Sequence, residues 1–334
     1  MINHWVQFLV CAAIIVFAGT KLTKSAAVVG DNTGIGSAWV GALMLPLATS
    51  MPELVTTIRA VMIDAPDLAL GNILGSCLYN LSLLAVIDLV EGHGPLTSRI
   101  NKGHTIVASL SIITICLAAM AVTGFFTAAL GWIGLETLFI VLVYTLGSRY
   151  IFRYEQKNAQ QLSGKTEALA EGIEQSTTRK ALLNFALASV LIVFAGVFLT
   201  DAADRVALVT GLGQTFVGSI LLAISTSLPE TVTTITAVRL GYLDMAVANI
   251  FGANFMNLFI IALADLFYFK GPLLQAVSDQ HLLSAVMVIM MSTIVIFGLT
   301  YKSKKRVAGI GFDTMLVLIA YLATVYLLFN ARGN

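Results

Sequence analysis

The stretch TSMPELVTT at residues 49–57 places a carboxylate, Glu53, among hydroxyl side chains inside a long apolar segment. Nearly the same stretch, TSLPETVTT, returns at residues 226–234. In each copy a serine stands three residues before a glutamate, as in a helix-capping box, and a proline occupies the first turn, where its missing N–H costs nothing. Each stretch therefore predicts a helix that breaks inside an apolar segment and restarts at the serine.

The surrounding composition is that of an integral membrane protein. Hydrophobic residues make up 58% of the chain and charged residues 11%, and the mean hydropathy is +0.90. These values exclude an ordinary soluble domain. Apolar segments of roughly 20 residues cross a bilayer as helices, and we expect such spans near 4–23, 36–61, 67–88, 105–124, 129–148, 181–199, 213–238, 244–267, 282–300 and 309–329.

Other classes of protein are excluded by what the chain lacks. Cys11, Cys77 and Cys116 all fall inside expected spans, so neither a disulfide framework nor a zinc spacing is available. The net charge of +1 gives no reason to expect a nucleic-acid partner. No nucleophile is placed with a base, so we expect no enzyme and no cofactor. Sustained alternation of polar and apolar residues is missing, which argues against a membrane β-barrel.

The repeated stretch is part of a longer repeat. A shift of 177 residues pairs Glu53 with Glu230, and it pairs IVFAG at 15–19 with IVFAG at 192–196. Each half contains five expected spans, an odd number, so the second half must enter the membrane from the opposite face. Inverted repeats of this kind characterise secondary transporters, whose substrate site lies near mid-membrane between the halves.

We therefore predict an all-α membrane protein of ten transmembrane helices in two inverted-topology five-helix repeats, with the second and seventh helices broken. Residues 1–148 form the first repeat, 149–180 a connecting loop and 181–334 the second repeat. Loops after odd-numbered spans hold 15 of the 19 Lys and Arg residues. Because cytoplasmic loops are enriched in these residues, we expect both termini outside, extracellular or periplasmic, and the connecting loop in the cytoplasm of a multi-pass cell (inner) membrane protein.

The two glutamates predict a cation site. A four-residue spacing places Thr49 and Thr57 on the helix face of Glu53. Oxygen ligands around two carboxylates on broken helices suit a hard cation such as Ca²⁺ or Na⁺. An ionised carboxylate near the bilayer centre costs at least ~2.5 kcal/mol, and a helix cap recovers about 1 kcal/mol, so capping alone does not explain two such residues. Proton carriage by the glutamates is the alternative.

At this point the motifs carry a resemblance. TSMPELVTTIRA and GNILGSCLYN in the first half, with TSLPETVTTITA and ANIFGANFMN in the second, resemble the two α-repeats of the sodium/calcium exchanger family of cation/Ca²⁺ antiporters. The resemblance covers essentially the whole chain and implies the ten-helix exchanger fold, with cation sites between the second, third, seventh and eighth spans. The ligands that it implies are the side chains of Thr49, Glu53, Ser76, Asn80, Thr226, Glu230 and Asn257, with carbonyls at or near Pro46 and Ala223.

The expected function is Na⁺/Ca²⁺ exchange by alternating access, with exchange of H⁺ for Ca²⁺ or another divalent cation as the alternative. Ca²⁺, Na⁺ and the lipid bilayer are the expected partners. A channel would share the acidic site but does not call for two inverted halves. Pro46 stands where many members of the family have a small residue. Ala253 replaces an expected serine, and Asn257 occupies a position that is Asp in some members, so two carboxylates remain and the stoichiometry is open.

Several acidic residues and two histidines lie outside the motifs, and we do not expect them to bind the cation. Glu136 and Asp313 are 177 residues apart inside expected spans, and we expect them to make structural hydrogen bonds. His104 and His281, also repeat mates, are expected to anchor at the membrane interface. Four aspartates near span ends are expected to be solvated: Asp64, Asp67, Asp244 and Asp265.

Overall fold

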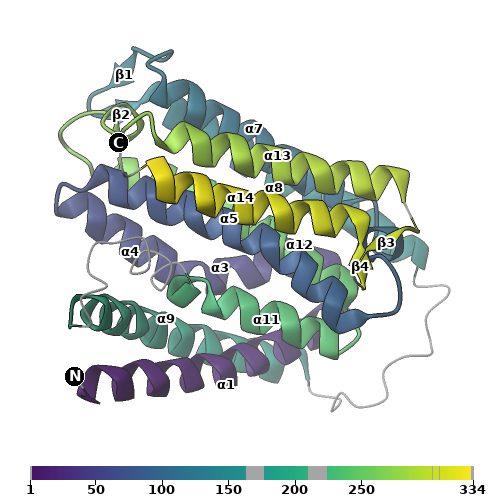
Figure 1. The fold of residues 1–334 in the computed structure, drawn as a ribbon. Coiled ribbons are helices and arrows are strands. Elements are labelled where there is room, and N and C mark those ends of the chain that lie inside the picture. Colours follow the sequence, from purple (N-terminus) through teal and green to yellow (C-terminus); the bar gives the residue numbers. More distant parts are fainter. Residues whose placement is uncertain (1, 163–176, 210–223, 303, 308, 332–334) are drawn as a thin grey trace.

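The computed structural model describes all residues except 1, 163–176, 210–223, 303, 308 and 332–334. The described chain is almost entirely helical, and its long helices lie side by side (Figure 1). Eight helices among the described residues are long and apolar enough to cross a membrane, and a ninth span is formed by Ser37–Thr49 with Met51–Met62, which bend by 45°. Large apolar side chains such as Leu9 and Phe194 face outwards, as lipid-facing residues do.

The first half of the chain contains one π-helical segment, η1, between ordinary helices. In chain order its elements are α1 (Ile2–Thr33), α2 (Ser37–Trp39), η1 (Val40–Met44), α3 (Leu45–Thr49), α4 (Met51–Met62), α5 (Pro66–Glu91), α6 (Leu96–Arg99), α7 (His104–Val122), β1 (Ala129–Leu130), β2 (Ile133–Gly134) and α8 (Leu135–Leu162).

The second half repeats this order where it is described. Its elements are α9 (Thr178–Val209), α11 (Leu228–Arg239), α12 (Leu243–Asp265), the 3₁₀ turn η2 (Leu273–Gln275), α13 (His281–Tyr301), β3 (Arg306–Val307), β4 (Ile310–Gly311) and α14 (Phe312–Ala331).

Apart from the seventh, which is described only in part, the expected spans match the observed helices, and four of them differ in their ends. The first and sixth spans run on as α1 and α9, which pack along each other (Figure 1). The fifth and tenth spans begin later than expected, because two short antiparallel ladders, β1–β2 and β3–β4, precede α8 and α14. These two short ladders are a small departure from the expected all-α fold. The seventh expected span, 213–238, lies partly outside the described residues, and so does the middle of the 149–180 loop, of which α8 occupies the part up to Leu162.

Helices α5 and α12 form the centre of the bundle. Of the most apolar window of each, 72% and 89% of the residues are buried. Small residues let the backbones meet: a Cβ added to Gly252 on α12 would overlap the main chain of Ala42 on η1, and one added to Gly41 would overlap the carbonyl of Met245. Such close approach is how membrane helices gain packing energy without a hydrophobic driving force.

Both glutamate motifs begin at a break in the backbone. Ser50, between α3 and α4, has φ −86° and ψ 9°, and Ser227, before α11, has φ −91° and ψ 11°. Two residues further on, Pro52 and Pro229 supply no N–H to the preceding turn. The observed 45° bend between α3 and α4 follows from this missing donor.

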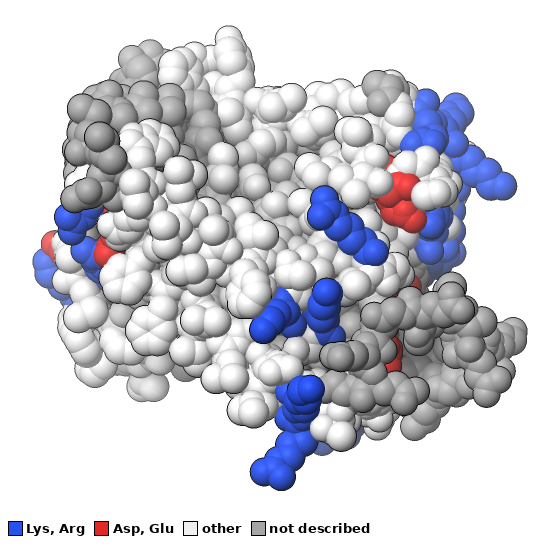
Figure 2. Space-filling model, turned by 90° about the horizontal axis from the view of Figure 1, so that it is seen from below, with Lys and Arg blue, Asp and Glu red and all other residues white. Residues whose placement is uncertain are grey.

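Charged side chains are few on the surface of the bundle. Figure 2 shows a mostly white face, with Lys and Arg near its middle and towards the end at which β3 and β4 lie in Figure 1, and a few more at the opposite end. A mostly apolar outer surface is typical of a protein that spans a bilayer.

Candidate functional site

Glu53 and Glu230 lie in the first turns of α4 and α11 and are almost completely buried, each 1% exposed. Their serine neighbours bind across the two halves. The Ser50 hydroxyl donates to Oε1 of Glu230 at 3.0 Å, and the Ser227 hydroxyl donates to Oε1 of Glu53 at 3.3 Å. Neither serine caps its own helix through its side chain. The expected capping boxes are therefore wrong. Each serine hydroxyl donates to the glutamate of the opposite half and does not cap its own helix.

The second oxygen of each glutamate is left without a partner. Oε2 of Glu53 and Oε2 of Glu230 are buried and accept no hydrogen bond within the described part of the chain. Buried polar atoms are nearly always paired, so an unpaired one calls for an explanation such as a missing ion or water. A cation between the two carboxylates would supply the missing partner for both oxygens.

Asn80 on α5 and Asn257 on α12 also keep an oxygen free. The amide nitrogen of Asn80 donates to Oδ1 of Asn254 at 3.2 Å, and that of Asn257 lies 3.9 Å from the Cys77 sulfur. The amide oxygens of Asn80 and Asn257 are buried and accept no hydrogen bond from described residues. Both side chains thus present an acceptor that is available to a cation.

Asn254 is the residue that the sequence reasoning missed. It receives the Asn80 amide and donates its own amide nitrogen to the Cys77 carbonyl at 3.2 Å. Its repeat mate is Cys77, so the comparison of the two halves did not draw attention to it. A buried amide next to a motif position, inside a membrane span, is the signal that could have identified it.

The remaining expected ligands differ in the hydrogen bonds that their oxygens already make. The Ser76 hydroxyl lies 3.1 Å from the Ser227 hydroxyl, which can accept its proton while donating to Glu53, and the Thr49 hydroxyl donates to the Leu45 carbonyl at 3.2 Å. The Pro46 carbonyl accepts the Ser50 amide at 2.9 Å and keeps a second lone pair. Of the last two, Thr226 is buried, and Ala223 lies outside the described residues.

Asn72 and Asn249, the other repeated asparagines, tie neighbouring helices together. The Asn72 amide donates to Thr57 at 3.3 Å, which joins α5 to α4. The Asn249 amide donates to Thr233 at 3.1 Å and to Thr234 at 3.0 Å, which joins α12 to α11. These bonds fix the glutamate-bearing helices against the central pair.

Asp265 is not solvated as expected. It is 1% exposed and accepts the backbone amides of Leu273 at 2.6 Å and Gly134 at 3.0 Å, together with the Thr137 hydroxyl at 2.6 Å. A span end can be buried when a loop folds over it, and here the 3₁₀ turn η2 covers the end of α12.

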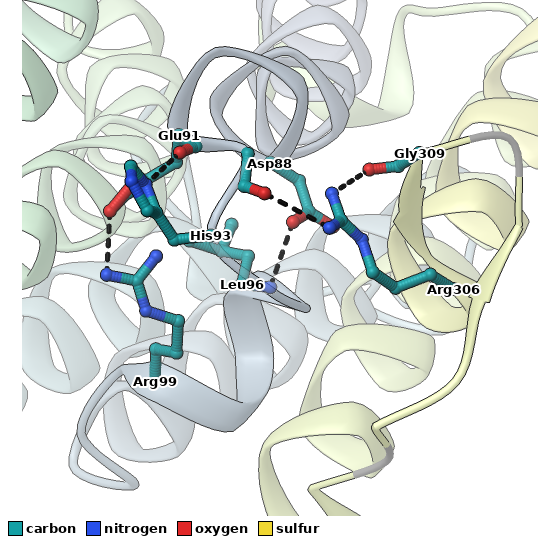
Figure 3. A network of polar contacts seen from close by, with 8 residues as sticks. Asp88, Glu91, His93, Leu96, Arg99, Arg306 and Gly309 are labelled. Carbon is teal, nitrogen blue, oxygen red and sulfur yellow. Dashed lines mark hydrogen bonds and ion pairs between the residues drawn. The ribbon is translucent and has the colours of Figure 1, made fainter.

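Asp88, for which the sequence suggested nothing, is the repeat mate of Asp265 and has the same set of donors. It accepts the amides of Leu96 at 3.0 Å and Gly311 at 2.7 Å and the Thr314 hydroxyl at 2.5 Å. Figure 3 shows Asp88 at the end of α5, with the Leu96 amide directed at its carboxylate.

Glu136 and Asp313 do not make the expected structural hydrogen bonds. Glu136 is fully buried and Asp313 nearly so, and none of their carboxylate oxygens accepts a hydrogen bond within the described chain. Hydrogen bonds among the described residues therefore do not explain why these two acids are buried.

His104 and His281, which are expected to anchor at the membrane interface, each pair with an aspartate of the opposite half. His104 Nε2 lies 2.8 Å from Asp244, and His281 Nε2 lies 3.1 Å from Asp67. Asp64 is exposed as expected, and its pKa is lowered by the hydrogen bond that it accepts from Lys270 at 2.5 Å.

The candidate site is thus a buried set of oxygens from α3, α4, α5, α11 and α12. Within the described residues no three His, Cys, Asp or Glu side chains come together as a metal cluster. Two carboxylates with amide, hydroxyl and carbonyl oxygens form a ligand set for hard cations, since soft metals require thiolate or imidazole ligands.

Comparison with known proteins adds family evidence to this geometry. Residues 3–148 and 180–330 match the family model described as sodium/calcium exchanger protein. The inner membrane protein YrbG of Escherichia coli is 26% identical over 248 residues, which cover 74% of each chain. The sodium/calcium exchanger MaX1 of Methanosarcina acetivorans is 24% identical, with 96% of this chain and 99% of that protein covered.

Solved structures match over nearly the full length. The sodium-calcium exchanger NCX_Mj, soaked with 2.5 mM Na⁺ and 0.1 mM Sr²⁺, superposes with a TM-score of 0.73 at 18% sequence identity, covering 97% of this chain and 98% of that one. The same protein without Na⁺ and Ca²⁺ superposes with a TM-score of 0.71. At this level of identity the match establishes a shared fold.

Proposed function

Because this chain belongs to the sodium/calcium exchanger protein family, we propose that it is a secondary antiporter that exchanges Ca²⁺ for Na⁺ at a site between its two halves. One observation carries the proposal: a buried carboxylate oxygen of Glu53 and one of Glu230 both lack a partner. A divalent ion compensates both charges at once and would also accept the free amide oxygens of Asn80 and Asn257 as ligands.

The proposed ligands are the side chains of Thr49, Glu53, Ser76, Asn80, Thr226, Glu230 and Asn257 and the carbonyls at or near Pro46 and Ala223. With two carboxylates, one Ca²⁺ or two Na⁺ leave the site neutral, whereas a third Na⁺ would leave it positive. We propose that this charge balance is what makes the two ions compete. Burial of an unbalanced charge costs free energy. A site without a cation is negative and a site with three Na⁺ is positive, so both states are disfavoured.

The proposed architecture is two inverted five-helix repeats, 1–148 and 181–334, joined by a cytoplasmic segment at 149–180, with both termini on the other side. The hydrogen bonds between Ser50 and Glu230 and between Ser227 and Glu53 support it, since they are related by the 177-residue shift. Alternating access then requires one half to move against the other around a shared site.

Proton-coupled Ca²⁺ transport is the second candidate. It is favoured by Ala253, whose methyl group cannot coordinate Na⁺ where the first half has Ser76. If protons rather than Na⁺ displace Ca²⁺ from Glu53 and Glu230, no Na⁺ has to bind near position 253, and no hydroxyl is needed there.

Reconstituted protein separates the two candidates. Proteoliposomes loaded with Na⁺ at uniform pH should take up Ca²⁺ when diluted into Na⁺-free buffer, because outward Na⁺ movement drives inward Ca²⁺ movement. Uptake that follows an imposed pH gradient and ignores the Na⁺ gradient supports the proton-coupled candidate instead. Ca²⁺ uptake that responds to neither gradient contradicts antiport of either kind.

A further inference from the structure

The outward face of α1 is apolar as far as Phe17 and then carries two exposed lysines. Leu9 and Phe17 are 63% and 56% exposed, as side chains that face lipid are. Figure 2 shows the molecule from the side of α1 and α9, with Lys and Arg near the middle of this face. A groove of about 540 Å³ follows the helix, and within the described chain it is lined by Ala13, Val16, Phe17, Thr20, Lys21 and Lys24. The groove is therefore apolar along most of its length and cationic at one end.

The two lysines lie close to a membrane boundary. Trp5, near the start of α1, is 43% exposed, and tryptophans of this kind gather at membrane interfaces. Lys21 and Lys24 follow it by 16 and 19 residues, which corresponds to roughly 24 and 29 Å of helix. The hydrocarbon core of a bilayer is about 30 Å thick. Both ammonium groups thus lie near the opposite boundary, where flexible lysine side chains can extend towards lipid headgroups.

Neither lysine has a carboxylate partner in the described part of the chain. The ion pairs among the described residues involve other cations, and Lys21 Nζ lies 4.7 Å from the centre of the Phe17 ring. The next acid along α1, Asp31, accepts the Tyr242 hydroxyl at 2.5 Å. Side chains three residues apart on a helix are neighbours, and like charges so placed destabilise it. An anion between Lys21 and Lys24 would remove their repulsion.

The other half of the chain lacks this pair of cations. The 177-residue shift that relates the halves places Phe198 and Asp201 of α9 where α1 has Lys21 and Lys24. Phe198 is 52% exposed, and Asp201 pairs with Arg59 at 2.6 Å. The helix pair therefore packs without lysines at these positions in its second member, so packing alone does not account for them.

We propose that the groove on α1 binds one anionic phospholipid, with its phosphate between Lys21 and Lys24 and an acyl chain along Val16 and Phe17. The phosphate supplies the negative charge that the two ammonium groups lack, and lysine binds phosphate as a point charge. The apolar part of the groove suits an acyl chain. A zwitterionic headgroup carries its own cation and compensates the lysines less well. Each basic residue near a membrane surface strengthens the binding of anionic lipid roughly fivefold.

Site-specific fluorescence quenching tests the proposal. A single tryptophan is introduced by Phe17→Trp in a chain whose three native tryptophans are replaced by Phe, and the protein is reconstituted into phosphatidylcholine bilayers with a small fraction of phosphatidylglycerol. Bromine atoms on acyl chains quench a tryptophan that they contact. Brominated phosphatidylglycerol should quench this tryptophan at least roughly fivefold more effectively than brominated phosphatidylcholine at the same fraction. The effect should saturate, because the groove holds one lipid.

The repeat provides a matched control, Phe194→Trp, at a side chain that is 62% exposed on α9. Helices α1 and α9 run antiparallel, since Gln7 donates to the Phe198 carbonyl and Val28 packs with Ala181. The two introduced tryptophans therefore lie at similar depths in the bilayer. Without lysines beside it, the tryptophan at position 194 should be quenched equally by the two brominated lipids.

Charge replacements locate the effect. Lys21→Gln with Lys24→Gln should abolish the preference for phosphatidylglycerol that Phe17→Trp reports. Lys304→Gln with Lys305→Gln removes the same charge at another place and should leave the preference unchanged. All four lysines are exposed, so these variants should fold.

Four results would overturn the proposal. A preference that survives the loss of Lys21 and Lys24 shows that they do not bind the headgroup. An equal preference at positions 17 and 194 shows that anionic lipid gathers around the whole protein. Quenching that rises in proportion to the phosphatidylglycerol content shows diffuse attraction without a site. Quenching by neither lipid shows that protein, such as a second copy of the chain, covers the groove.

The unaltered chain allows a second measurement. In native mass spectrometry of the detergent-purified protein, a phosphatidylglycerol adduct should form at a several-fold lower lipid concentration than a phosphatidylcholine adduct. Glycerol 3-phosphate, which carries the phosphate without acyl chains, should not displace it. Adducts of the two lipids at equal concentrations would contradict the proposal, and displacement by glycerol 3-phosphate would show a phosphate site that does not require a lipid.

Discussion

Ser50 donates a hydrogen bond to Glu230 in the opposite half of the chain, with 3.0 Å between Oγ and Oε1. The reciprocal bond from Ser227 to Glu53 measures 3.3 Å. Each glutamate is thus oriented by the other half, and its second oxygen is left for a ligand. Any displacement of one half against the other would change the geometry of both carboxylates together, and we expect this to couple occupancy of the proposed site to the arrangement of the halves.

Replacement of either glutamate should abolish Ca²⁺ transport. Glu53→Gln or Glu230→Gln removes one of the two charges that compensate for dehydration of a divalent ion. The measurement is Ca²⁺ uptake into proteoliposomes, and the control is Asp64→Asn, which alters an exposed ion pair with Lys270 outside the proposed site. Robust uptake by either glutamine variant would show that the site lies elsewhere.

Restoring a hydroxyl at position 253 should strengthen Na⁺ binding. Ser76 of the first half lies 3.1 Å from the Ser227 hydroxyl, and its repeat mate in the second half is Ala253, which has no hydroxyl. We expect Ala253→Ser to raise apparent Na⁺ affinity or steepen the Na⁺ dependence. Ca²⁺ affinity should stay within about threefold, or roughly 0.6 kcal/mol. Ca²⁺ uptake against graded Na⁺ measures both, and an unchanged Na⁺ curve with a large Ca²⁺ shift would favour proton coupling.

Asn254 should matter through Asn80, whose amide it accepts. Without that acceptor the Asn80 side chain is free to turn its oxygen away from the site, and we expect Asn254→Ala to weaken apparent Ca²⁺ affinity about tenfold, or ~1.4 kcal/mol. A double-mutant cycle with Asn80→Ala provides the check, because residues that act together give non-additive effects. Purely additive losses would mean that Asn254 does not orient Asn80.

The close contact between α12 and η1 should not tolerate a methyl group. A Cβ on Gly252 would lie 2.6 Å from the Ala42 carbonyl carbon and 2.8 Å from its Cα, distances that only a backbone shift could relieve. Gly252→Ala should sharply reduce the yield of folded protein by size-exclusion chromatography. The control is Gly75→Ala, because Gly75 is the repeat mate of Gly252 and a Cβ added to it would have nothing within 4 Å. Equal yields for the two variants would contradict the packing argument.

The proposed orientation can be read from chemical labelling. A cysteine introduced by Ser163→Cys, in a background without Cys116, should resist an impermeant thiol reagent applied outside intact cells and react after the membrane is opened. Cys116 must be removed because its side chain is exposed on the bundle. Labelling from outside would reverse the proposed topology.

The sequence predicted the broken second span and the burial of both glutamates, because Glu53 and Glu230 stand out when the two halves are aligned. Contacts between halves were not predictable in the same way. A capping motif looks the same whether its serine binds its own helix or the opposite one, so the exchange between Ser50 and Glu230 required the tertiary structure.

The sequence also did not predict which residues at the ends of spans are buried. Asp265 follows an apolar segment, as a solvated aspartate would, yet η2 folds over it and its donors come from residues far along the chain, such as Gly134 and Thr137. Asn254 escaped notice because its repeat mate is Cys77, and a comparison of halves finds only what both halves share.

Asp88 draws donors from Gly311 and Thr314, and Asp265 draws them from Gly134 and Thr137, so each half completes the buried carboxylate of the other. A half made alone would bury an aspartate with most of its donors missing, and we expect it not to reach a folded state. Under the proposed topology, a single-half ancestor could have met the same need by pairing with a second copy inserted in the opposite direction. Gene fusion would then have made permanent a mutual dependence that already existed between two separate chains.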